Sequence, residues 1–262
     1  KIINLFFDLR KELTDPLPPE TRRKYQLPEI KDAVYSIHFP KSFGEAERAR
    51  KRFNFEELLL IQLRVLKERL RLKEHQAPVI QLNLPLMKEF VGSLPFQLTN
   101  AQRRSIWEII QDISRARPMN RLLEGDVGSG KTVVAAAASL LAVKAGYRVA
   151  FMAPTEILAK QHFETLGKVL APFRVKLGLV MGSEKRVEKD TEVVVGTHAL
   201  IQNKVKFENP GLVIVDEQHR FGVEQRAALI SRESAIVLPH FLSMSATPIP
   251  RTLALTIYGD LD

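Results

Sequence analysis

From about residue 94 the chain alternates short apolar runs with longer stretches of helical character. Apolar runs of the length of a buried strand occur at residues 121–124, 147–152, 175–181, 193–195, 212–215 and 241–244. Between them, the Ala- and Leu-rich residues 133–145, followed by Gly146, and the apolar spacing within residues 163–170 predict helices. Strands that alternate with helices are typical of βαβ units. We therefore expect residues 94–262 to form an α/β domain, a mostly parallel sheet covered by helices on both faces.

Residues 1–93 follow a different pattern, which predicts a linker and a helical connector. Four prolines punctuate residues 14–30 and predict an extended segment without a helix of any length: Pro16, Pro18, Pro19 and Pro28. Ser42 with Glu45 fits a capping box at the start of a helix. Further along, four leucines recur at the spacing of one helix face, namely Leu59, Leu63, Leu66 and Leu70. The Lys and Arg side chains around this stripe form either a solvated helix face or a nucleic-acid contact surface.

The composition is that of a globular protein with an excess of basic residues. In 262 residues, 39 Lys and Arg outnumber 30 Asp and Glu, so a polyanionic partner is a reasonable expectation. Cysteine is absent, which excludes disulfides, thiolate metal sites and cysteine nucleophiles. No apolar run approaches the ~18 residues of a membrane span, and no signal peptide opens the chain, so we expect a cytoplasmic protein without a membrane partner. The chain begins at Lys1 and ends at Asp262 just after an apolar run, and we expect it to be a piece of a longer protein.

The most specific signal is a glycine-rich loop that matches the pattern G-x-x-x-x-G-K followed by Ser or Thr. Its residues are Gly125, Asp126, Val127, Gly128, Ser129, Gly130, Lys131 and Thr132. A strand candidate precedes the loop and a helix candidate follows it, as a phosphate-binding loop requires. In such a loop the backbone N–H groups face phosphate oxygens, Lys131 reaches the β- and γ-phosphates, and Thr132 offers its hydroxyl to Mg²⁺. The motif therefore predicts binding of a nucleoside triphosphate with Mg²⁺, rather than a plain glycine-rich turn.

A second motif begins where the apolar run 212–215 ends, at Asp216, Glu217, Gln218 and His219. A strand that ends in two carboxylates places both at the carboxyl edge of the sheet, where the phosphate loop also lies. We expect Asp216 to hold Mg²⁺, either directly or through water, and Glu217 to orient and deprotonate the attacking water. His219 is a weaker candidate, because an ordinary surface or core histidine would fit the same position.

The residues around these two motifs resemble the boxes of superfamily-two helicases, in the order found in that family. The matching segments are 96–102, 153–161, 196–199, 216–219 and 243–248. The resemblance implies a RecA-like domain that binds ATP. It implies that Phe96 and Gln102 form an adenine-reading Q motif, whose Gln amide pairs with adenine N6 and N7. It also places Ser245 and Thr247 in the Ser-Ala-Thr box, which links the nucleotide state to domain movement.

Finer features resemble the RecG branch of this superfamily. Residues 216–223 and 246–253 are similar to the corresponding motor segments of that branch, and residues 37–73 are similar to its connector between wedge and motor domains. The resemblance implies a monomeric translocase on double-stranded DNA that uses ATP to remodel branched DNA, such as stalled forks and Holliday junctions. The family's wedge domain would precede Lys1, and a second RecA-like domain with arginine fingers would follow Asp262.

Three other functions stay open beside this one. A fragment without arginine fingers can be a nucleotide-dependent DNA-binding module that does not turn over alone. The transcription-repair coupling translocase shares much of the motor, but it usually carries a different residue at the position of Gln218 and lacks the connector. An RNA helicase is disfavoured by the connector and by the residues that follow His219.

DNA contacts are expected from small hydroxyl residues at strand ends, because a translocase must grip the phosphate backbone without reading bases. Thr155 follows one predicted strand and begins a helix, and Thr197 follows a neighbouring strand. Both are expected to bind phosphate, with Lys160 as a nearby cation. The alternative is that the two threonines are only caps and turn residues.

The connection over residues 182–192 is short for a crossover between parallel strands, which needs a dozen or more residues. The resembled family usually has a longer helical segment there. Either the connection is degenerate or residues have been omitted from the sequence, and we expect the omission.

Overall fold

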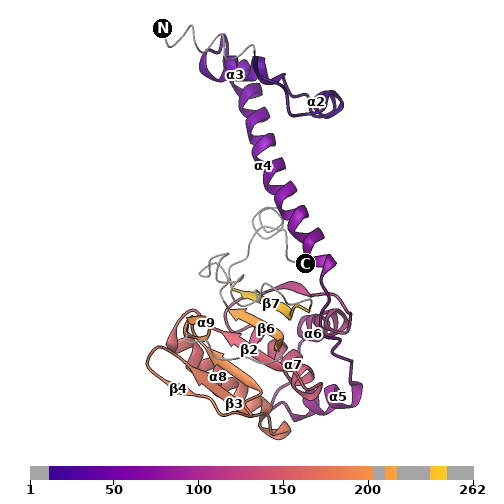
Figure 1. Cartoon of the computed structure of the whole chain (residues 1–262), viewed down its shortest axis with the longest axis vertical. Coiled ribbons are helices and arrows are strands. Elements are labelled where there is room, and N and C mark those ends of the chain that lie inside the picture. Colours follow the sequence, from indigo (N-terminus) through magenta and orange to yellow (C-terminus); the bar gives the residue numbers. More distant parts are fainter. Residues whose placement is uncertain (1–11, 203–209, 217–236, 247–262) are drawn as a thin grey trace. The chain divides into compact units, whose positions relative to one another are not determined.

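The computed structural model describes residues 12–202, 210–216 and 237–246 (Figure 1). The described residues fall into two compact units, one that ends at Lys67 and one that begins at Glu68. The expected domain boundary at residue 93 lies further along the chain than this division. The difference arises because Ile80, Met87 and Phe90 are buried in the same hydrophobic core as the sheet of the second unit. The assignment of residues 1–93 to a connector stays a prediction.

The first unit is helical. Its helices are α2 (Pro19–Tyr25), α3 (Ile30–His38) and the part of α4 (Phe43–Glu74) that precedes residue 68. The helix α4 begins as predicted, because the Ser42 hydroxyl accepts a hydrogen bond from the Glu45 N–H at 3.3 Å. The prediction that residues 14–30 contain no helix was wrong. Pro19 occupies the first turn of α2, where a missing N–H has no cost, so a proline pair starts this helix instead of preventing it.

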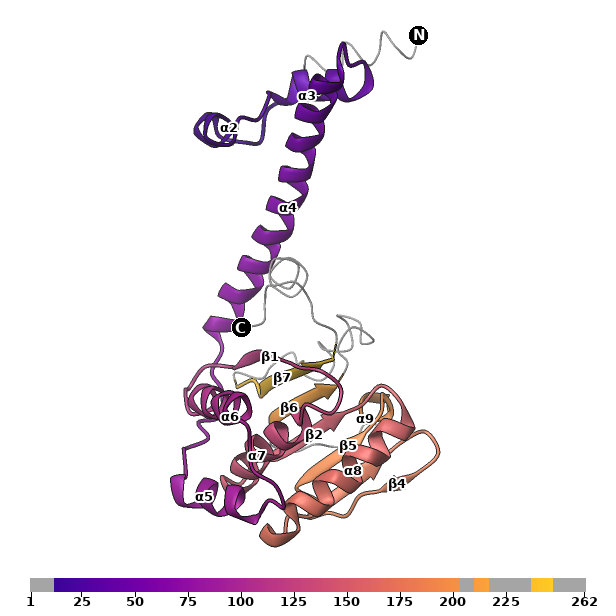
Figure 2. The same ribbon diagram turned by 180° about the vertical axis from the view of Figure 1, so that it is seen from behind.

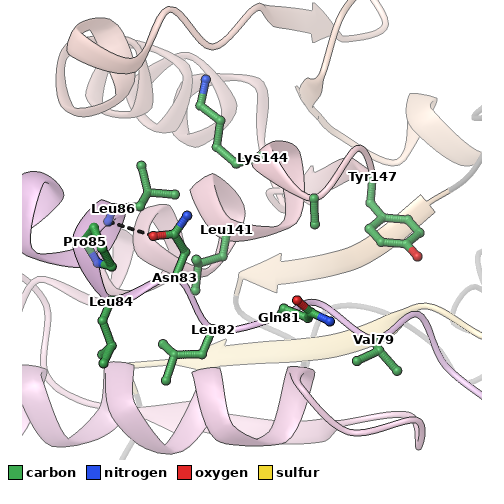
Figure 3. Close-up of a pocket in the computed structure, with 11 residues that line it drawn as sticks. Val79, Gln81, Leu82, Asn83, Leu84, Pro85, Leu86, Leu141, Lys144 and Tyr147 are labelled. Carbon is green, nitrogen blue, oxygen red and sulfur yellow. Dashed lines mark hydrogen bonds between the residues drawn. The ribbon is translucent and has the colours of Figure 1, made fainter.

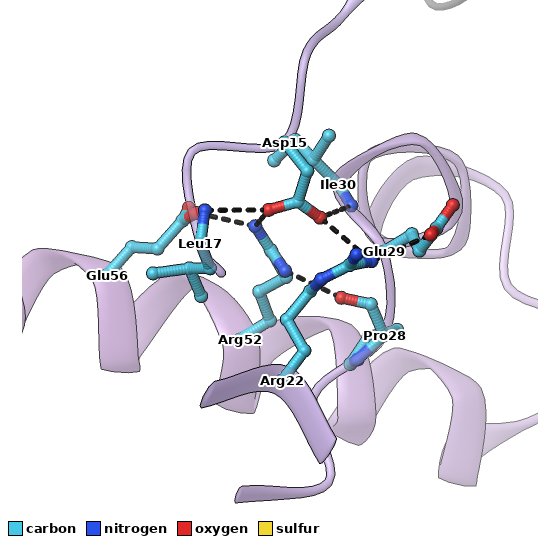
Figure 4. Close-up of polar contacts among 8 residues, drawn as sticks. All are labelled: Asp15, Leu17, Arg22, Pro28, Glu29, Ile30, Arg52 and Glu56. Carbon is cyan, nitrogen blue, oxygen red and sulfur yellow. Dashed lines mark hydrogen bonds and ion pairs between the residues drawn. The ribbon is translucent and has the colours of Figure 1, made fainter. Parts of the chain in front are cut away.

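Arg52 holds the first unit together from inside α4, since its side chain is fully buried (Figure 4). One terminal nitrogen donates to the Pro28 carbonyl oxygen at 2.7 Å. The other terminal nitrogen donates to Oδ1 of Asp15 at 2.6 Å and to Oε1 of Glu56 at 2.7 Å. These bonds link the proline-rich segment to α4 through a guanidinium group that is shielded from solvent.

The carboxylate of Asp15 is the other centre of this cluster. It accepts the backbone N–H of Leu17 at Oδ1 and that of Ile30 at Oδ2, each at 2.9 Å. Burial acts to raise the pKa of Asp15, but the hydrogen bonds from Arg52 and from the two backbone N–H groups outweigh it, and the pKa lies below its ordinary value. The ionised form of Asp15 is therefore the one that organises this segment.

The second unit contains, within its described residues, seven strands in one sheet of order β1-β7-β6-β2-β5-β3-β4. Their bounds are β1 Asn120–Glu124, β2 Arg148–Met152, β3 Leu177–Val180, β4 Lys185–Arg186, β5 Val193–Gly196, β6 Pro210–Asp216 and β7 His240–Ser245. All neighbouring pairs are parallel except β3 with β4. Both views show β7 toward one edge of this sheet and β3 and β4 toward the other, and Figure 2 shows β1 beside β7 (Figures 1 and 2). The expected mostly parallel sheet is confirmed.

Helices cover the sheet. Those described in this unit, besides the end of α4, are α5 Leu84–Ser93, α6 Asn100–Ile113, α7 Lys131–Lys144, α8 Glu156–Leu170, the 3₁₀ helix η1 Ala171–Phe173 and the short α9 Ala199–Gln202. The helices α7 and α8 contact each other, and they pack on β2 and β6 and on β3 and β5 respectively. Leu212 and Ile214 of β6 share the core of these helices, while the alternate residues Val213 and Val215 are equally buried. Both faces of the strand are thus removed from water, as expected in a parallel sheet.

The connection between β3 and β5 lies wholly within the described residues, and it contains no helix. It forms the two-residue strand β4 and then passes closely over β3 at Gly178, where a Cβ would lie 2.9 Å from Cγ2 of Thr191 and 3.0 Å from the carbonyl oxygen of Arg186. The absence of a side chain at Gly178 therefore lets the chain return beside its own strand. The structure joins β3 to β5 with the residues present, and the expected omission of residues stays a prediction.

Candidate nucleotide-binding site

The predicted phosphate loop lies between β1 and α7. Gly128 and Gly130 have φ angles of 80° and 84°, in the left-handed region that side chains disfavour. Gly130 is the N-cap of α7, and within the described residues no side-chain hydrogen bond caps this helix. The first turn of a fourteen-residue helix therefore presents its N–H groups at the end of a glycine loop, which is an arrangement suited to phosphate.

The side chain of Lys131 folds back on the loop. Its ammonium group donates to the carbonyl oxygens of Gly125, at 2.5 Å, and of Asp126, at 3.0 Å. Phosphate oxygens form stronger, charge-assisted hydrogen bonds with an ammonium group than neutral carbonyls do. A bound nucleotide would therefore compete well for this cation without a large movement of the backbone.

Gln102 meets the phosphate loop from the start of α6. Its side-chain oxygen accepts the Thr99 N–H at 2.9 Å, and the Thr99 hydroxyl accepts the Gln102 N–H at 3.2 Å, so the two residues form a reciprocal capping box. Its side-chain nitrogen donates to the carbonyl oxygen of Ser129 at 2.7 Å. Both ends of the amide thus have partners, and reading adenine would require a rearrangement. The adenine contact of Gln102, and that of the half-exposed Phe96, stay predictions.

The strand β7 ends beside the same loop. Its residue Ser245 pairs with Glu124 in the register of β1, and its carbonyl oxygen accepts the N–H of Gly125 at 3.2 Å. The Ser-Ala-Thr segment is therefore bonded through its backbone to the first residue of the phosphate loop. The other predicted coupling residue, Thr247, lies outside the described residues.

Asp216 ends β6 at the same edge of the sheet, and its side chain is nearly buried. Its Oδ2 lies 2.7 Å from Nε2 of His162. The other ring nitrogen of His162, Nδ1, lies 3.4 Å from the hydroxyl oxygen of Thr132. The two predicted Mg²⁺ ligands, one on α7 and one on β6, are therefore brought to opposite nitrogens of a single imidazole.

His162 was not among the predicted site residues. It lies on the buried face of α8, which also carries Ala159, Leu166 and Leu170. Polar residues are seldom buried without a partner, so a histidine within this apolar spacing was the signal that could have identified it. The predicted residues Glu217 and His219 lie outside the described residues.

The predicted DNA-contacting residues lie at the same edge, displaced from the phosphate loop. Thr155 is the N-cap of α8, and its hydroxyl accepts the Leu158 N–H at 3.3 Å. Thr197 follows β5, which is the parallel neighbour of β2, and its hydroxyl is 3.5 Å from the Ala199 N–H. Lys160 is exposed on α8. Each threonine thus forms a local backbone contact, and their binding to phosphate stays a prediction.

A surface pocket lies at the opposite end of α7, between that helix and residues 79–86 (Figure 3). Two of its polar side chains already have partners, since Asn83 accepts the Leu86 N–H at 3.0 Å and Lys144 donates to the Phe173 carbonyl oxygen at 2.9 Å. The fourteen residues of α7 separate this pocket from the phosphate loop by about 20 Å, at 1.5 Å per residue. The pocket is therefore not part of the nucleotide site.

Neither a membrane span nor a ready-made metal cluster is present among the described residues. No helix in the described ranges is long and apolar enough to cross a membrane. The same ranges contain no group of three or more His, Asp or Glu side chains arranged to hold a metal ion by themselves. A Mg²⁺ ion that is shared with nucleotide phosphates needs only one or two protein ligands, so the pair Thr132 and Asp216 is sufficient for such an ion.

Comparisons with known proteins agree with this geometry. The family model for DEAD/DEAH box helicases matches residues 99–256, more than half of the chain, and the chain therefore belongs to that family. The ATP-dependent DNA helicase RecG of Synechocystis sp. is 46% identical over 96% of this chain and 31% of its own length. RecG of Thermotoga maritima is 47% identical over 95% of this chain and 33% of its own length. The predicted resemblance to RecG is confirmed, and the chain spans about a third of the length of these relatives.

Solved structures confirm the RecA-like fold. A structure of RecG bound to a three-way DNA junction superposes with a TM-score of 0.80 at 44% identity, covering 95% of this chain and 35% of that one. The UvsW helicase of bacteriophage T4 superposes with a TM-score of 0.52 at 16% identity, covering 72% of this chain and 67% of that one. At so low an identity, the second likeness concerns the fold alone.

Proposed function

We propose that this chain is the connector and first motor domain of an ATP-dependent DNA helicase that acts on branched DNA. The observation that carries the proposal is the meeting of Thr132 and Asp216 at one imidazole beside the phosphate loop. Similarity to RecG helicases at 46% identity supports the substrate class. We infer that the partners are double-stranded and branched DNA, such as replication forks and Holliday junctions, and that the protein works as a cytoplasmic monomer in recombination and repair.

The roles within the site follow from the chemistry of each group. The N–H groups at the start of α7 and the ammonium of Lys131 bind the phosphates. Thr132 and Asp216 hold Mg²⁺, an oxygen-seeking cation that neutralises phosphate charge when bound. Glu217 orients and deprotonates the attacking water, and His219 is the weaker catalytic candidate. Gln102 reads adenine once its side-chain amide no longer donates to the carbonyl oxygen of Ser129.

The DNA contacts and the coupling residues complete the proposal. Thr155 and Thr197 bind backbone phosphates through hydroxyl and backbone N–H groups, and Lys160 adds charge. Ser245 and Thr247 transmit the nucleotide state, which is supported by the backbone bond from Gly125 to Ser245. A RecA-like partner domain must supply arginine fingers, which contribute about 10³–10⁵ in rate in related sites.

The test separates binding from turnover. A fluorescent ADP analogue with Mg²⁺ should bind the chain, while ATP turnover should stay low even with forked DNA. In the longer protein, Lys131→Ala should abolish turnover, and Glu217→Gln should stop hydrolysis while it spares binding. Equal loss of nucleotide binding in both variants would contradict these roles.

The second candidate function is a nucleotide-dependent binding module that never turns over, and the third is the motor of a transcription-repair coupling translocase. Absence of DNA-stimulated turnover from the longer protein would favour the binding module. Strong stimulation by forked DNA over linear duplex and over RNA favours the branched-DNA helicase instead. The linear duplex is the matched control, because it offers the same phosphates without a junction.

A further inference from the structure

The imidazole of His162 occupies a position between three elements. It projects from α8, it is bonded to Asp216 at the end of β6, and it lies next to Thr132 in the first turn of α7. Its ring also packs against that of Phe151 on β2, with the ring centroids 4.7 Å apart. The side chain is only 11% exposed, so packing and hydrogen bonds together fix its orientation.

We propose that His162 is a positioning residue for Mg²⁺, one that orients both protein ligands of the ion without binding it. This inference rests on the proposed function, in which Thr132 and Asp216 hold Mg²⁺. A ligating carboxylate is commonly fixed by a hydrogen bond from an outer residue, because an unrestrained carboxylate loses rotational freedom on binding the ion. The bond from Nε2 to Oδ2 leaves Oδ1 of Asp216 in a defined direction.

The proton positions follow from the hydrogen-bonding groups. An ionised carboxylate only accepts hydrogen bonds, so Nε2 of His162 carries a proton and donates it to Asp216. If the ring is neutral, Nδ1 is then an acceptor, and the Thr132 hydroxyl, whose oxygen lies 3.4 Å away, is placed to donate to it. A hydroxyl that binds Mg²⁺ must direct a lone pair at the ion and its proton elsewhere. His162 therefore gives Thr132 the orientation that a metal ligand needs.

Burial alone does not account for this arrangement. A residue needed only to fill the space between α8 and β6 would be apolar, like Leu166 one turn further along the same helix face. Both ring nitrogens instead face side-chain oxygens on two other elements. Replacing the imidazole by an apolar group would leave the buried carboxylate of Asp216 without this donor, and it would free the Thr132 hydroxyl to rotate.

The test compares three variants of His162 in the whole chain. His162→Leu keeps approximate volume and removes both nitrogens. His162→Gln keeps a donor near the position of Nε2, and His162→Asn keeps a polar group nearer that of Nδ1. Affinity for a fluorescent ADP analogue is measured in EDTA and across a Mg²⁺ titration, and the melting temperature is recorded without nucleotide.

The expected result is a loss confined to the metal-dependent part of binding. His162→Leu and His162→Asn should raise the Mg²⁺ concentration at half-maximal enhancement by about 10–100-fold, with the affinity in EDTA within about twofold of wild type. His162→Gln should recover most of the loss at a similar melting temperature. An unchanged Mg²⁺ midpoint in the Leu variant would overturn the inference. Equal losses of Mg²⁺ enhancement in the Gln and Asn variants would also overturn it. The comparison of these two variants is the deciding test if the Leu variant does not fold.

Failure of the inference can be told apart from failure of the proposed function. Asp216→Asn serves as the reference variant, because it removes the proposed ligand itself. If the wild-type chain shows no Mg²⁺ enhancement, or if Asp216→Asn leaves the enhancement intact, the proposed metal site is wrong. If Asp216→Asn removes the enhancement while His162→Leu retains it, only the role of His162 is wrong.

Discussion

The contact between Gln102 and the phosphate loop leads to a quantitative prediction for Gly130→Ala. Gly130 has a φ of 84°, and a Cβ built on it would clash with the side-chain nitrogen of Gln102. The substitution therefore has two separable effects. It strains the backbone, and it pushes the Gln102 amide away from the carbonyl oxygen of Ser129, to which it donates at 2.7 Å.

The backbone strain and the lost hydrogen bond contribute different amounts to the free energy of unfolding, and only the second depends on Gln102. An L residue in the left-handed region costs about 1–2 kcal/mol. Loss of the hydrogen bond to Ser129 costs about 0.5–1.5 kcal/mol. Gly130→Ala should therefore lower the free energy of unfolding by about 1.5–3.5 kcal/mol in the wild-type background. In a Gln102→Ala background only the strain remains, so the double-mutant cycle should show a coupling of about 1 kcal/mol.

Urea unfolding of the whole chain measures these values, and fluorescence of Trp107 reports on the second unit because this single tryptophan lies on α6. Gly128→Ala is the matched control. Gly128 has a φ of 80°, but a Cβ there would meet no described atom within 4 Å, so only the strain should appear and no coupling to Gln102. Equal costs for both glycine substitutions in both backgrounds would refute the contact between Gln102 and the loop.

Three other predictions address the connector, the core and the DNA contacts. Arg52→Met should destabilise residues 14–38 by about 1–3 kcal/mol, read by hydrogen exchange against the exposed control Arg50→Met, because Asp15 keeps Arg22 at 3.3 Å but loses the donor from Arg52, and the Pro28 carbonyl oxygen loses its donor as well. Burial lowers the pKa of His240, so protonation of this side chain favours the unfolded state. The melting temperature should therefore be highest above about pH 6.5 and fall below it, and the fall should be shallower for His240→Gln. In a protein of RecG length that contains this chain, Thr155→Ala with Thr197→Ala should weaken DNA binding equally on all sequences and leave ADP affinity within about twofold. Sequence-selective loss would contradict backbone contacts.

Sequence reasoning succeeded where the signal was local. The phosphate loop needs particular residues at particular spacings, and the strand that ends at Asp216 is an uninterrupted apolar run. The pattern of alternating strands and helices was enough to predict a parallel sheet, because few other arrangements bury such strands on both faces. The same reasoning failed for α2, because proline disfavours a helix interior but is tolerated in the first turn, where Pro19 lies.

What the sequence could not supply was the order of strands. The neighbours of β6 are β7 and β2, which come from segments far apart in the chain, and no local pattern specifies that order. His162 was missed for the same reason. Its partners Thr132 and Asp216 lie 30 and 54 positions away, so its role appears only when three elements are brought together.

The strand order also explains how one edge of the sheet can serve two candidate sites. The phosphate loop and Asp216 follow β1 and β6, while Thr155 and Thr197 follow β2 and β5 on the other side of β6. The helix α8 begins at the second group with Thr155 and reaches the first group with His162, seven positions later, or about 10 Å along a helix axis at 1.5 Å per residue. If α8 moves as one body, a displacement of its N-terminus by DNA would act on the imidazole that is hydrogen-bonded to Asp216. The proposed positioning residue His162 and two of the residues proposed to contact DNA, Thr155 and Lys160, therefore lie on one helix or at its N-cap, so a shift of α8 at one candidate site would be transmitted to the other.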